Sequence, residues 1–334
     1  MLAIWPPMSV SSNLSILLIA LLVEAAFGYP AALLQAIRHP VIWIGVLIDR
    51  LDRHLNRESL PAALRRISGV IVLVILLAVS ILPALVVQIA LFDILPGLLA
   101  ALFAGVAASS LIAQRSLWHH VAATATGLEK GGVAGGRAAV SHIVGRDPES
   151  LDEAGISRAA IESLAENFSD GIVAPAFWCA LFGLPGIAAY KTVNTADSMI
   201  GHRTERHRAF GWAAARFDDL VNLPASRLSA IWIVLAAYVA GADAAGAARA
   251  VLRDARHHKS PNAGWPEAAM AGALGLRIAG PRVYGSDRVD DPWMGDGRAE
   301  ATAADIRRAL DLYRVACGIQ IAVVAMIAAL VMIA

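Results

Sequence analysis

The segment 67–92 reads ISGVIVLVILLAVSILPALVVQIALF, with no charged residue among its 26 positions. The hydrocarbon core of a bilayer is about 30 Å thick, and a helix needs about 20 apolar residues to cross it. Segments 94–113 and 315–334 are also uncharged, and each is 20 residues long. A fourth apolar segment, 11–27, is shorter and includes Glu24. The sequence therefore predicts an all-α, multi-pass integral membrane protein with about four spanning helices.

The composition of the 334-residue chain agrees with this prediction. Hydrophobic residues make up 57% of it and charged residues 16%, and the mean hydropathy is +0.60. These values are too apolar for an ordinary soluble domain. A net charge of +1 gives no reason to expect a nucleic-acid partner. The two cysteines, Cys179 and Cys317, lie in apolar segments, and we expect them to be packing residues rather than a disulfide or a metal site. No internal repeat divides the chain, so we expect residues 1–334 to form a single membrane-embedded domain.

The basic residues predict the topology. All 28 Lys and Arg residues lie in four stretches, 28–66, 114–170, 191–227 and 249–314. The predicted hairpin at 93–96, where the span 67–92 turns into the span 94–113, contains no Lys or Arg. Because Lys and Arg accumulate on the cytoplasmic side of cell (inner) membrane proteins, we expect all four stretches to be cytoplasmic. Both termini of the chain would then lie outside.

Two further apolar segments, 172–189 and 228–242, would have cytoplasmic residues at both ends under this topology. The sequence GLPG at 183–186 should break the first helix, and the second reaches Asp243 after only about 15 apolar residues. We therefore expect re-entrant or protein-buried broken helices, because such segments must be shielded from lipid. The alternative is that both cross fully, which would place 191–227 outside.

The first of four polar clusters precedes residue 172. Glu162, Glu166 and Asp170 recur at four-residue spacing, which places them on one helix face, and Asn167 lies beside them. Carboxylates at this spacing repel one another, and Mg²⁺ prefers oxygen ligands. The cluster therefore indicates a cation site, with a solvated helix face as the alternative.

The second cluster contains Lys191, Asn194 and Asp197 together with hydroxyl side chains. A lone lysine after an apolar helix could simply extend toward the membrane surface. That explanation does not account for its neighbours, which are suited to binding phosphate and a metal ion.

The third cluster contains Asp218, Asp219 and Asn222 directly before an apolar helix, where a solvated acidic face is unexpected. The fourth is a loop, 254–267, that includes Asn262. Its prolines and glycine define a fixed loop, and its amide and basic groups suit an anionic small molecule. The adjacent histidines in this loop point apart, which makes a metal site there the weaker interpretation.

Several common nucleotide-binding and catalytic motifs are absent. The chain has no Gly-x4-Gly-Lys-Ser/Thr motif, which excludes a P-loop. The glycine-rich segment 127–137 lacks the strand and helix that would flank a phosphate-binding loop, and we expect a flexible connector there. A nucleotide would therefore need a site of another kind.

The polar clusters resemble the signature segments of the CobD/CbiB family, the adenosylcobinamide-phosphate synthases of cobalamin (vitamin B12) biosynthesis. The resemblance extends over nearly the whole chain. The segments that carry it are 39–45 (HPVIWIG), 157–171 (SRAAIESLAENFSDG), 190–199 (YKTVNTADSM), 213–220 (AAARFDDL), 260–267 (SPNAGWPE) and 295–297 (GDG).

The resemblance implies a membrane enzyme that joins adenosylcobyric acid to (R)-1-amino-2-propanol or its O-phosphate, driven by ATP hydrolysis. The corrinoid and the aminopropanol would be its substrates, and neighbouring cobalamin-assembly enzymes in the bilayer would be its partners. A carboxylate resists attack by an amine, so its oxygen must first become a leaving group. We expect an acyl phosphate, with Mg²⁺ and fixed cations to balance its charge.

The chemistry assigns roles to the polar positions as hypotheses. The predicted catalytic residues are Glu166, Asp170, Lys191, Asp197, Asp218 and Asp219. The predicted Mg²⁺ ligands among them are Glu166, Asp197, Asp218 and Asp219. The residues predicted to bind ATP or to orient the substrates are Asn167, Asn194, Arg203, Arg216, Asn222 and Asn262.

Three other functions compete with this hypothesis. A membrane prenyltransferase also mounts paired aspartates near the membrane, but its usual Asn-x3-Asp-x3-Asp spacing is absent. A transporter would use broken helices and buried polar groups, but the chain has no inverted repeat. A non-enzymatic relative of the same family would not be expected to keep the acidic clusters intact.

Overall fold

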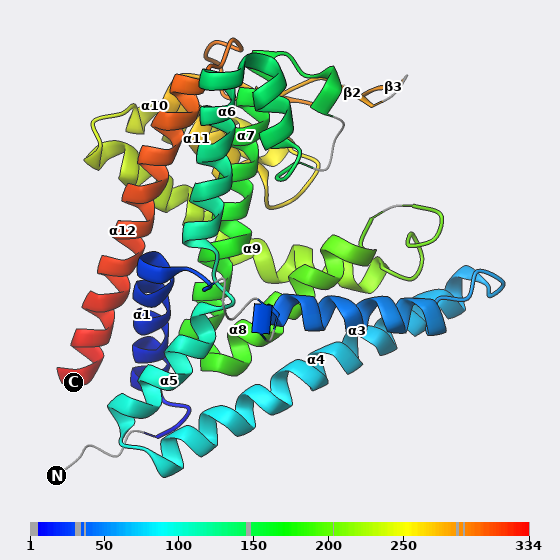
Figure 1. Cartoon of the computed structure of the whole chain (residues 1–334), viewed down its shortest axis with the longest axis vertical. Coiled ribbons are helices and arrows are strands. Elements are labelled where there is room, and N and C mark those ends of the chain that lie inside the picture. Colours follow the sequence, from blue (N-terminus) through cyan, green and yellow to red (C-terminus); the bar gives the residue numbers. More distant parts are fainter. Residues whose placement is uncertain are drawn as a thin grey trace. The chain divides into compact units, whose positions relative to one another are not determined.

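The computed structural model describes residues 6–30, 35–36, 38–144, 148–202, 204–284, 287–289 and 291–333. The chain forms two compact units (Figure 1). Unit 1 comprises residues 1–113, 174–222 and 323–334. Unit 2 comprises residues 114–173 and 223–322.

Unit 1 consists of helices. They are α1 (Val10–Phe27), α3 (Pro40–Leu55), α4 (Ala62–Ile94), α5 (Gly97–Ser109) and α8 (Ala174–Ile200), with the first part of α9 (Trp212–Val239) and the end of α12 (Ala303–Ile333). Only Leu95 and Pro96 separate α4 from α5, which confirms the predicted hairpin.

Unit 2 holds the remaining parts of α9 and α12 and several shorter elements. Its other helices are α6 (Gln114–Val140), η1 (Pro148–Ser150), α7 (Glu153–Phe168), the π-helix η2 (Ser169–Val173), α10 (Ala244–Asp254), η3 (Ala255–His257) and α11 (Gly264–Leu274). Its strands form two antiparallel pairs, β1 (Ile278–Ala279) with β4 (Trp293–Met294) and β2 (Arg282–Tyr284) with β3 (Asp287–Val289).

Six helical stretches in the described part of the chain are long and apolar enough to cross a membrane. This confirms an all-α, multi-pass membrane protein. The count exceeds the expected four because segments 172–189 and 228–242 belong to longer helices, Glu153–Ile200 and Trp212–Val239. At 1.5 Å per residue, a 28-residue helix such as α9 is about 42 Å long. Its length therefore does not require re-entry into the membrane.

The predicted break in α8 occurs at Gly183, whose backbone has φ +63° and ψ −144°. Two buried amides satisfy the backbone groups beside the break. Gln88 Oε1 of α4 accepts from the Leu184 N–H at 2.7 Å, and Asn13 Nδ2 of α1 donates to the Leu181 carbonyl at 3.0 Å. The two amides also bond each other, from Gln88 Nε2 to Asn13 Oδ1 at 3.2 Å. The break is thus closed by side chains from two other helices, as a break at membrane depth requires.

A glycine is needed at position 183. Besides adopting positive φ, it leaves space that a Cβ atom would take from the side-chain amides of Gln88 and Asn13. A second close approach joins α1 to α5, where a Cβ on Gly105 would lie 2.6 Å from Ile19 Cγ2. Small residues at such crossings let membrane helices pack closely without a hydrophobic driving force.

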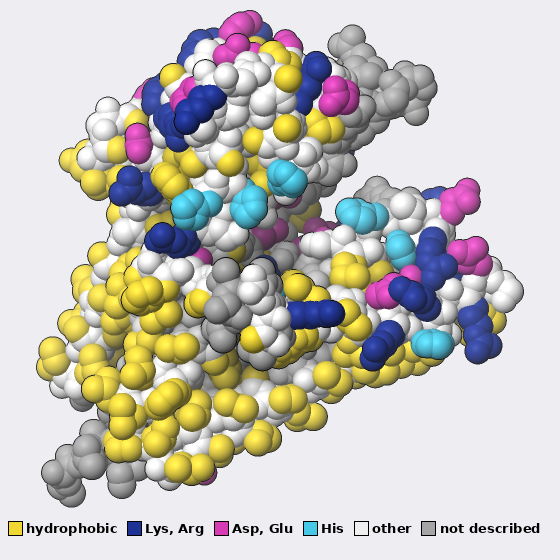
Figure 2. Space-filling model, viewed as in Figure 1, with side chains coloured by type: hydrophobic (Ala, Val, Ile, Leu, Met, Phe, Trp, Pro, Cys, Tyr) yellow, Lys and Arg dark blue, Asp and Glu magenta, His cyan; other side chains and the backbone are white. Residues whose placement is uncertain are grey.

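The outer surface of α4 is apolar along most of its length. Val70, Val74, Leu82 and Val86 are exposed on it. In Figure 2 hydrophobic side chains follow this helix, whereas Arg, His, Asp and Glu side chains gather at the end where α3 joins α4. An apolar band ending in a charged group is the pattern expected of a helix that faces lipid.

Unit 2 has a core of small residues. α11 packs against α10 and α7, and every residue from Pro266 to Leu274 is buried. A Cβ on Gly272 would overlap the Gly246 carbonyl, so the backbones of α10 and α11 touch. The prediction of a flexible connector at 127–137 is wrong. This segment is helical on both sides of a reversal at Gly132, and its glycines let the two helical parts pack together.

Replacing Gln88 by Leu should destabilise unit 1. The substitution leaves the Leu184 N–H without an acceptor in an apolar setting, at a cost of about 1–3 kcal/mol. Unfolding of the detergent-solubilised protein by denaturant measures this cost. Gln320→Leu is the control. Gln320 is equally buried, but its amide has no hydrogen-bond partner in the described part of the chain. Equal unfolding midpoints for Gln88→Leu and wild type would contradict the proposed role of Gln88.

Candidate functional site

The end of α8 and the start of α9 bring part of the predicted site together in unit 1. Asn222 Nδ2 donates to Asp218 Oδ2 at 2.9 Å, and the Tyr190 hydroxyl donates to Asn222 Oδ1 at 2.8 Å. The side chain of Asn194 also hydrogen-bonds Asp218. Asp218 and Asn222 are both buried, with 8% and 1% of their surfaces exposed. The second and third polar clusters of the sequence therefore form one cluster in space.

Three carboxylates in this cluster repel one another. Asp218 is close enough to both Asp197 and Asp219 for each to oppose its ionisation. One oxygen of Asp218, Oδ1, is buried and has no hydrogen-bond partner among the described residues. A buried carboxylate oxygen without a donor is costly, because the solvation it has lost is not replaced. Such an oxygen is suited to accept a cation or a proton donor.

Two glycines allow the end of α8 to lie against the start of α9. The Gly201 N–H donates to the Asp197 carbonyl at 2.7 Å, and a Cβ on Gly201 would overlap the Asp197 carboxylate. A Cβ on Gly211 would overlap the Ile200 carbonyl. A larger residue at position 211 would push the start of α9 away from the end of α8, and one at position 201 would displace the Asp197 carboxylate.

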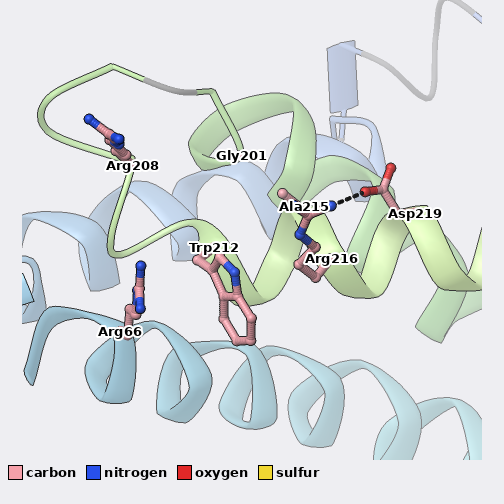
Figure 3. Close-up of a pocket in the computed structure, with 7 residues that line it drawn as sticks. All are labelled: Arg66, Gly201, Arg208, Trp212, Ala215, Arg216 and Asp219. Atoms are coloured by element: carbon pink, nitrogen blue, oxygen red, sulfur yellow. Dashed lines mark hydrogen bonds and ion pairs between the residues drawn. The ribbon is translucent and has the colours of Figure 1, made fainter. Parts of the chain in front are cut away.

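A cavity of about 580 Å³ opens beside the carboxylates (Figure 3). Its lining includes Arg66, Gly201, Arg208, Trp212, Arg216 and Asp219. Arg216 Nη1 lies 3.3 Å from Asp219 Oδ2, so these two charges are paired. Arg66 of α4 reaches up toward Trp212, and its guanidinium carbon is 6.0 Å from the centre of the indole ring. The cavity thus has a basic and aromatic side and an acidic side.

The loop that carries Arg208 is fastened to α3 by Asp52. Arg206 Nη2 donates to Asp52 Oδ2 at 2.9 Å, and His207 Nε2 lies 3.4 Å from the same oxygen. Asn56 Nδ2 bonds both Asp52 Oδ1, at 2.7 Å, and the Arg206 carbonyl, at 3.0 Å. Burial by itself would raise the pKa of Asp52, but hydrogen bonds from Asn56 and Arg206 outweigh it and hold this pKa below its ordinary value.

The start of α3 lies near Lys191. His39 caps this helix by accepting from the Val41 N–H at 3.2 Å. Burial, and then the positive charge of Lys191, lower the pKa of His39 and favour a neutral imidazole. Lys191 Nζ is 3.5 Å from Asn194 Oδ1, which links it to the carboxylate cluster. The segment 39–45 therefore contributes to the same part of unit 1.

Four predicted site residues lie in unit 2. Glu166 and Asn167 are exposed near the end of α7, and Asp170 lies in the π-helix η2, which changes the helical register after residue 168. Asn167 Nδ2 donates to the Ser163 carbonyl at 2.9 Å. Glu162, one turn before Glu166, is buried and accepts from the Ala279 N–H at 2.9 Å.

The fourth, Asn262, is held within unit 2. Its Oδ1 accepts from Ser226 Oγ at 3.1 Å and from Arg227 Nη1 at 3.0 Å. The guanidinium carbon of Arg227 lies 4.4 Å from the centre of the Trp265 ring. These contacts fix the loop 258–263 to α9, and the role of Asn262 toward substrate stays a prediction.

Two site predictions, Arg203 and the Mg²⁺ ligands, depend on more than the residues that the structure describes. Arg203 lies outside them. In the part of the chain that the structure describes, no three His, Cys, Asp or Glu side chains are arranged to hold a metal ion by themselves. The assignment of Glu166, Asp197, Asp218 and Asp219 as Mg²⁺ ligands is therefore a prediction that needs further oxygen ligands from a substrate.

Three residues that line the cavity had no predicted role in a site. Arg66 and Arg208 served only as markers of topology, and Trp212 had no assigned role. Arg66 follows another arginine directly before an uncharged span, and Trp212 lies one position after Gly211. Neither sequence pattern indicates a ligand site by itself. The two residues become neighbours only because the fold brings α4 beside the start of α9.

The chain is similar to proteins of known family. A profile of the family described as "CobD/Cbib protein" matches residues 17–313. "Cobalamin biosynthesis protein CobD" of Rhizobium meliloti is 52% identical over 310 residues, which cover 92% of this chain and 94% of the relative. The protein of the same name from Rhodobacter capsulatus is 48% identical over 316 residues, covering 95% and 98%. The protein from Brucella suis is 49% identical over 306 residues, covering 90% and 92%. No solved structure matches the chain.

Replacing Asp52 by Ala should release the loop 204–211, because Arg206 and His207 lose their shared acceptor. Trypsin should then cleave after Arg206 or Arg208 at least about tenfold faster, as expected for a loss of about 1.4 kcal/mol. Asp49→Ala is the control, since the half-buried Asp49 pairs with Arg53 and with no other charged residue that the structure describes. Equal cleavage rates in both variants would show that Asp52 does not hold the loop.

The same contact predicts a pH dependence. The folded pKa of Asp52 is lowered, so its stabilisation is complete above its ordinary value of 3.8 and is lost as pH falls through the folded value. The loop of the wild-type protein should therefore become cleavable only below about pH 4, which an acid-active protease can test.

Proposed function

Because this chain belongs to the CobD/CbiB family of cobalamin biosynthesis proteins, we propose that it is an ATP-dependent amide ligase. In this proposal it joins the carboxyl group of adenosylcobyric acid to (R)-1-amino-2-propanol or its O-phosphate. A role in cobalamin biosynthesis follows from the family. The reaction and its substrates are the proposed part.

One observation supports the proposal most strongly: the surroundings of Asp218 differ from those of the other buried aspartates among the described residues. Asp52 is paired with Arg206, Asp254 with Arg253, and Asp305 with Arg298. Asp218 has only neutral amide donors and no ion-pair partner in the described chain. A buried carboxylate held in position by amides has no protein cation beside it and can receive a cation or a proton brought by a substrate.

The proposed reaction has two balanced steps. First, an oxygen of the corrinoid carboxylate attacks the γ-phosphorus of ATP, the bond from phosphorus to the bridging oxygen breaks, and ADP leaves with that electron pair. Second, the amine nitrogen attacks the acyl carbon, the carbon–oxygen bond to phosphate breaks, and inorganic phosphate leaves. The nitrogen loses one proton in this step, and we propose Asp197 or Asp218 as its acceptor.

Mg²⁺ fits the carboxylate cluster when it arrives with a polyphosphate. Mg²⁺ in nucleotide sites commonly uses one or two carboxylates, and phosphate oxygens and water complete its octahedron. Asp218 Oδ1, which lacks a donor, and the neighbouring Asp197 and Asp219 would hold it. When bound, the ion would neutralise charge that develops on the transferred phosphoryl group.

The remaining residues of unit 1 would hold and orient reactants. Asn194 and Asn222 fix the position of the Asp218 carboxylate through their amides. Lys191 and Arg216 supply positive charge for phosphate oxygens. Contacts from Glu166, Asn167, Asp170, Arg203 and Asn262 to the substrates are part of the proposal.

The location of the reaction follows from the same proposal. ATP is available in the cytoplasm, and residues from the basic stretches 28–66 and 191–227 line one cavity, so the two stretches lie on the same side of the membrane. Both are predicted to be cytoplasmic, which requires the helices that flank 191–227 to re-enter rather than to cross fully. We therefore place the protein in the cell (inner) membrane with its site facing the cytoplasm, beside other enzymes of cobalamin assembly. The names of its relatives favour this function over a prenyltransferase or a transporter.

Purified protein in detergent or lipid, incubated with adenosylcobyric acid, aminopropanol phosphate and Mg·ATP, should form an amide and ADP in equal amounts. Mass spectrometry of the corrinoid and a coupled ADP assay measure the two products. Reactions without the amine or without Mg²⁺ are the controls. Amide formation without ATP, or ADP release that does not depend on the corrinoid, would contradict the proposal.

Asp218→Asn should lower kcat by about 100-fold or more, the loss expected when a charge-stabilising group leaves an active site. The variant should unfold at the same denaturant concentration as wild type or higher, because the substitution removes repulsion by Asp197 and Asp219. Asp93→Asn, at the exposed end of α4, is the control and should keep wild-type turnover. A destabilised Asp218→Asn protein with normal turnover would assign Asp218 a structural role instead.

A further inference from the structure

Two arginines of the cavity in unit 1 are not neutralised by protein charges. Arg216 is paired with Asp219, whereas Arg66 and Arg208 form no ion pair or side-chain hydrogen bond in the described part of the chain. Both side chains are exposed, and both line the same cavity. Two uncompensated guanidinium groups from separate segments create a positive field suited to an anion with several oxygens.

Trp212 adds an aromatic surface to this basic wall. It is the first residue of α9, and 46% of its surface is exposed although indole is largely apolar. In Figure 3 its ring lies between Arg66 and the helix that carries Arg216. An exposed tryptophan face stacks on any planar heteroaromatic ring, including a nucleobase, and an adjacent arginine strengthens the stacking.

The size and position of the cavity narrow the choice of ligand. Its volume of about 580 Å³ lies within the range of small-molecule sites and far exceeds the size of a phosphorylated three-carbon amine. Gly201 and Asp219 also line it, and Gly201 touches the Asp197 carboxylate. A ligand that fills the cavity would therefore bring its end close to the carboxylate cluster.

We infer that this cavity binds a nucleoside triphosphate, with the base stacked on Trp212 and the phosphate oxygens on Arg66 and Arg208. The inference rests on the proposed function, which requires a nucleoside triphosphate in the part of unit 1 that holds the carboxylate cluster. It adds a location in unit 1 and three residues that no motif of the sequence indicates. A phosphorylated amine shares the phosphoryl group but lacks the base, so the two ligands can be told apart.

Equilibrium binding to the full-length protein in detergent tests the inference without requiring turnover. The probes are Mg²⁺ with adenylyl imidodiphosphate, Mg²⁺ with tripolyphosphate, and aminopropanol phosphate, measured by calorimetry or by quenching of tryptophan fluorescence. Arg66→Gln and Arg208→Gln should each weaken binding of both polyphosphates about tenfold, the loss of one charge-assisted contact. Arg57→Gln, an exposed arginine between α3 and α4 that does not line the cavity, is the control and should bind as wild type does.

Substitutions at Trp212 distinguish binding of the base from binding of the phosphates. Trp212→Ala should weaken the nucleotide about tenfold and leave tripolyphosphate unchanged, and Trp212→Phe should retain most of the affinity. If Trp212→Ala leaves nucleotide affinity unchanged, or if aminopropanol phosphate alone binds and depends on Arg66 and Arg208, the inference is overturned. Unaltered unfolding midpoints of the variants exclude misfolding as the cause of any loss.

The outcomes also distinguish this inference from the proposed function. Nucleotide binding that depends on Trp212, together with no amide product, supports the inference and overturns the ligase proposal. ATP-dependent amide formation with unchanged nucleotide affinity in all three cavity variants supports the ligase proposal and overturns the inference.

Discussion

The arrangement of unit 1 depends on how a broken helix satisfies its backbone groups at membrane depth. A helix that breaks at Gly183 leaves N–H and carbonyl groups which lipid cannot solvate. Gln88 from α4 and Asn13 from α1 meet these groups and bond each other, so one buried contact joins three helices. Because α8 continues from this contact to Lys191 and Asp197, the position of the carboxylate cluster is set by a polar contact far from it along the helix.

The two sides of the cavity show two uses of charge. On the side of α3, Asp52 is neutralised by Arg206, and the result is a fixed loop. On the side of α9, three carboxylates remain close together, with amide donors around Asp218. The first arrangement stabilises the fold and the second opposes it. Repulsion that the fold maintains at a concave surface is common where a protein binds a charged substrate, since the substrate removes the repulsion.

The sequence predicted the parts of this structure that depend on local patterns. Uncharged runs such as 67–92 fix the spans, the GLPG motif fixes the break at Gly183, and the four-residue spacing of Asp218 and Asn222 places them in contact on one helix face. The patterns failed where packing decided the outcome. The glycines of 127–137 suggest flexibility in isolation, but they permit close contact between two helical parts.

Residues brought together from distant segments were the least predictable. The spacing of Glu162 assigns it to the acidic helix face, but its carboxylate accepts a hydrogen bond from the Ala279 N–H. Ala279 is a non-glycine residue with positive φ. Arg66 and Trp212 carry no motif, because their meaning depends on α4 lying beside the start of α9. Sequence spacing predicts which side chains lie together on one helix. It does not predict which side chains from separate segments line the same cavity.

The amides around Asp218 bear on the role proposed for this carboxylate. A guanidinium in place of Asn194 or Asn222 would neutralise Asp218, as Arg206 does for Asp52, and would leave little attraction for an incoming cation. An apolar residue there would leave the carboxylate without any donor and free to turn away. An amide does neither: it fixes the orientation through one hydrogen bond and brings no opposing charge. Tyr190 extends this restraint by holding Asn222 in turn, so the direction of the Asp218 carboxylate is set by a chain of neutral groups. In the proposed function, a metal–nucleotide substrate would bring the opposing charge that this cluster lacks.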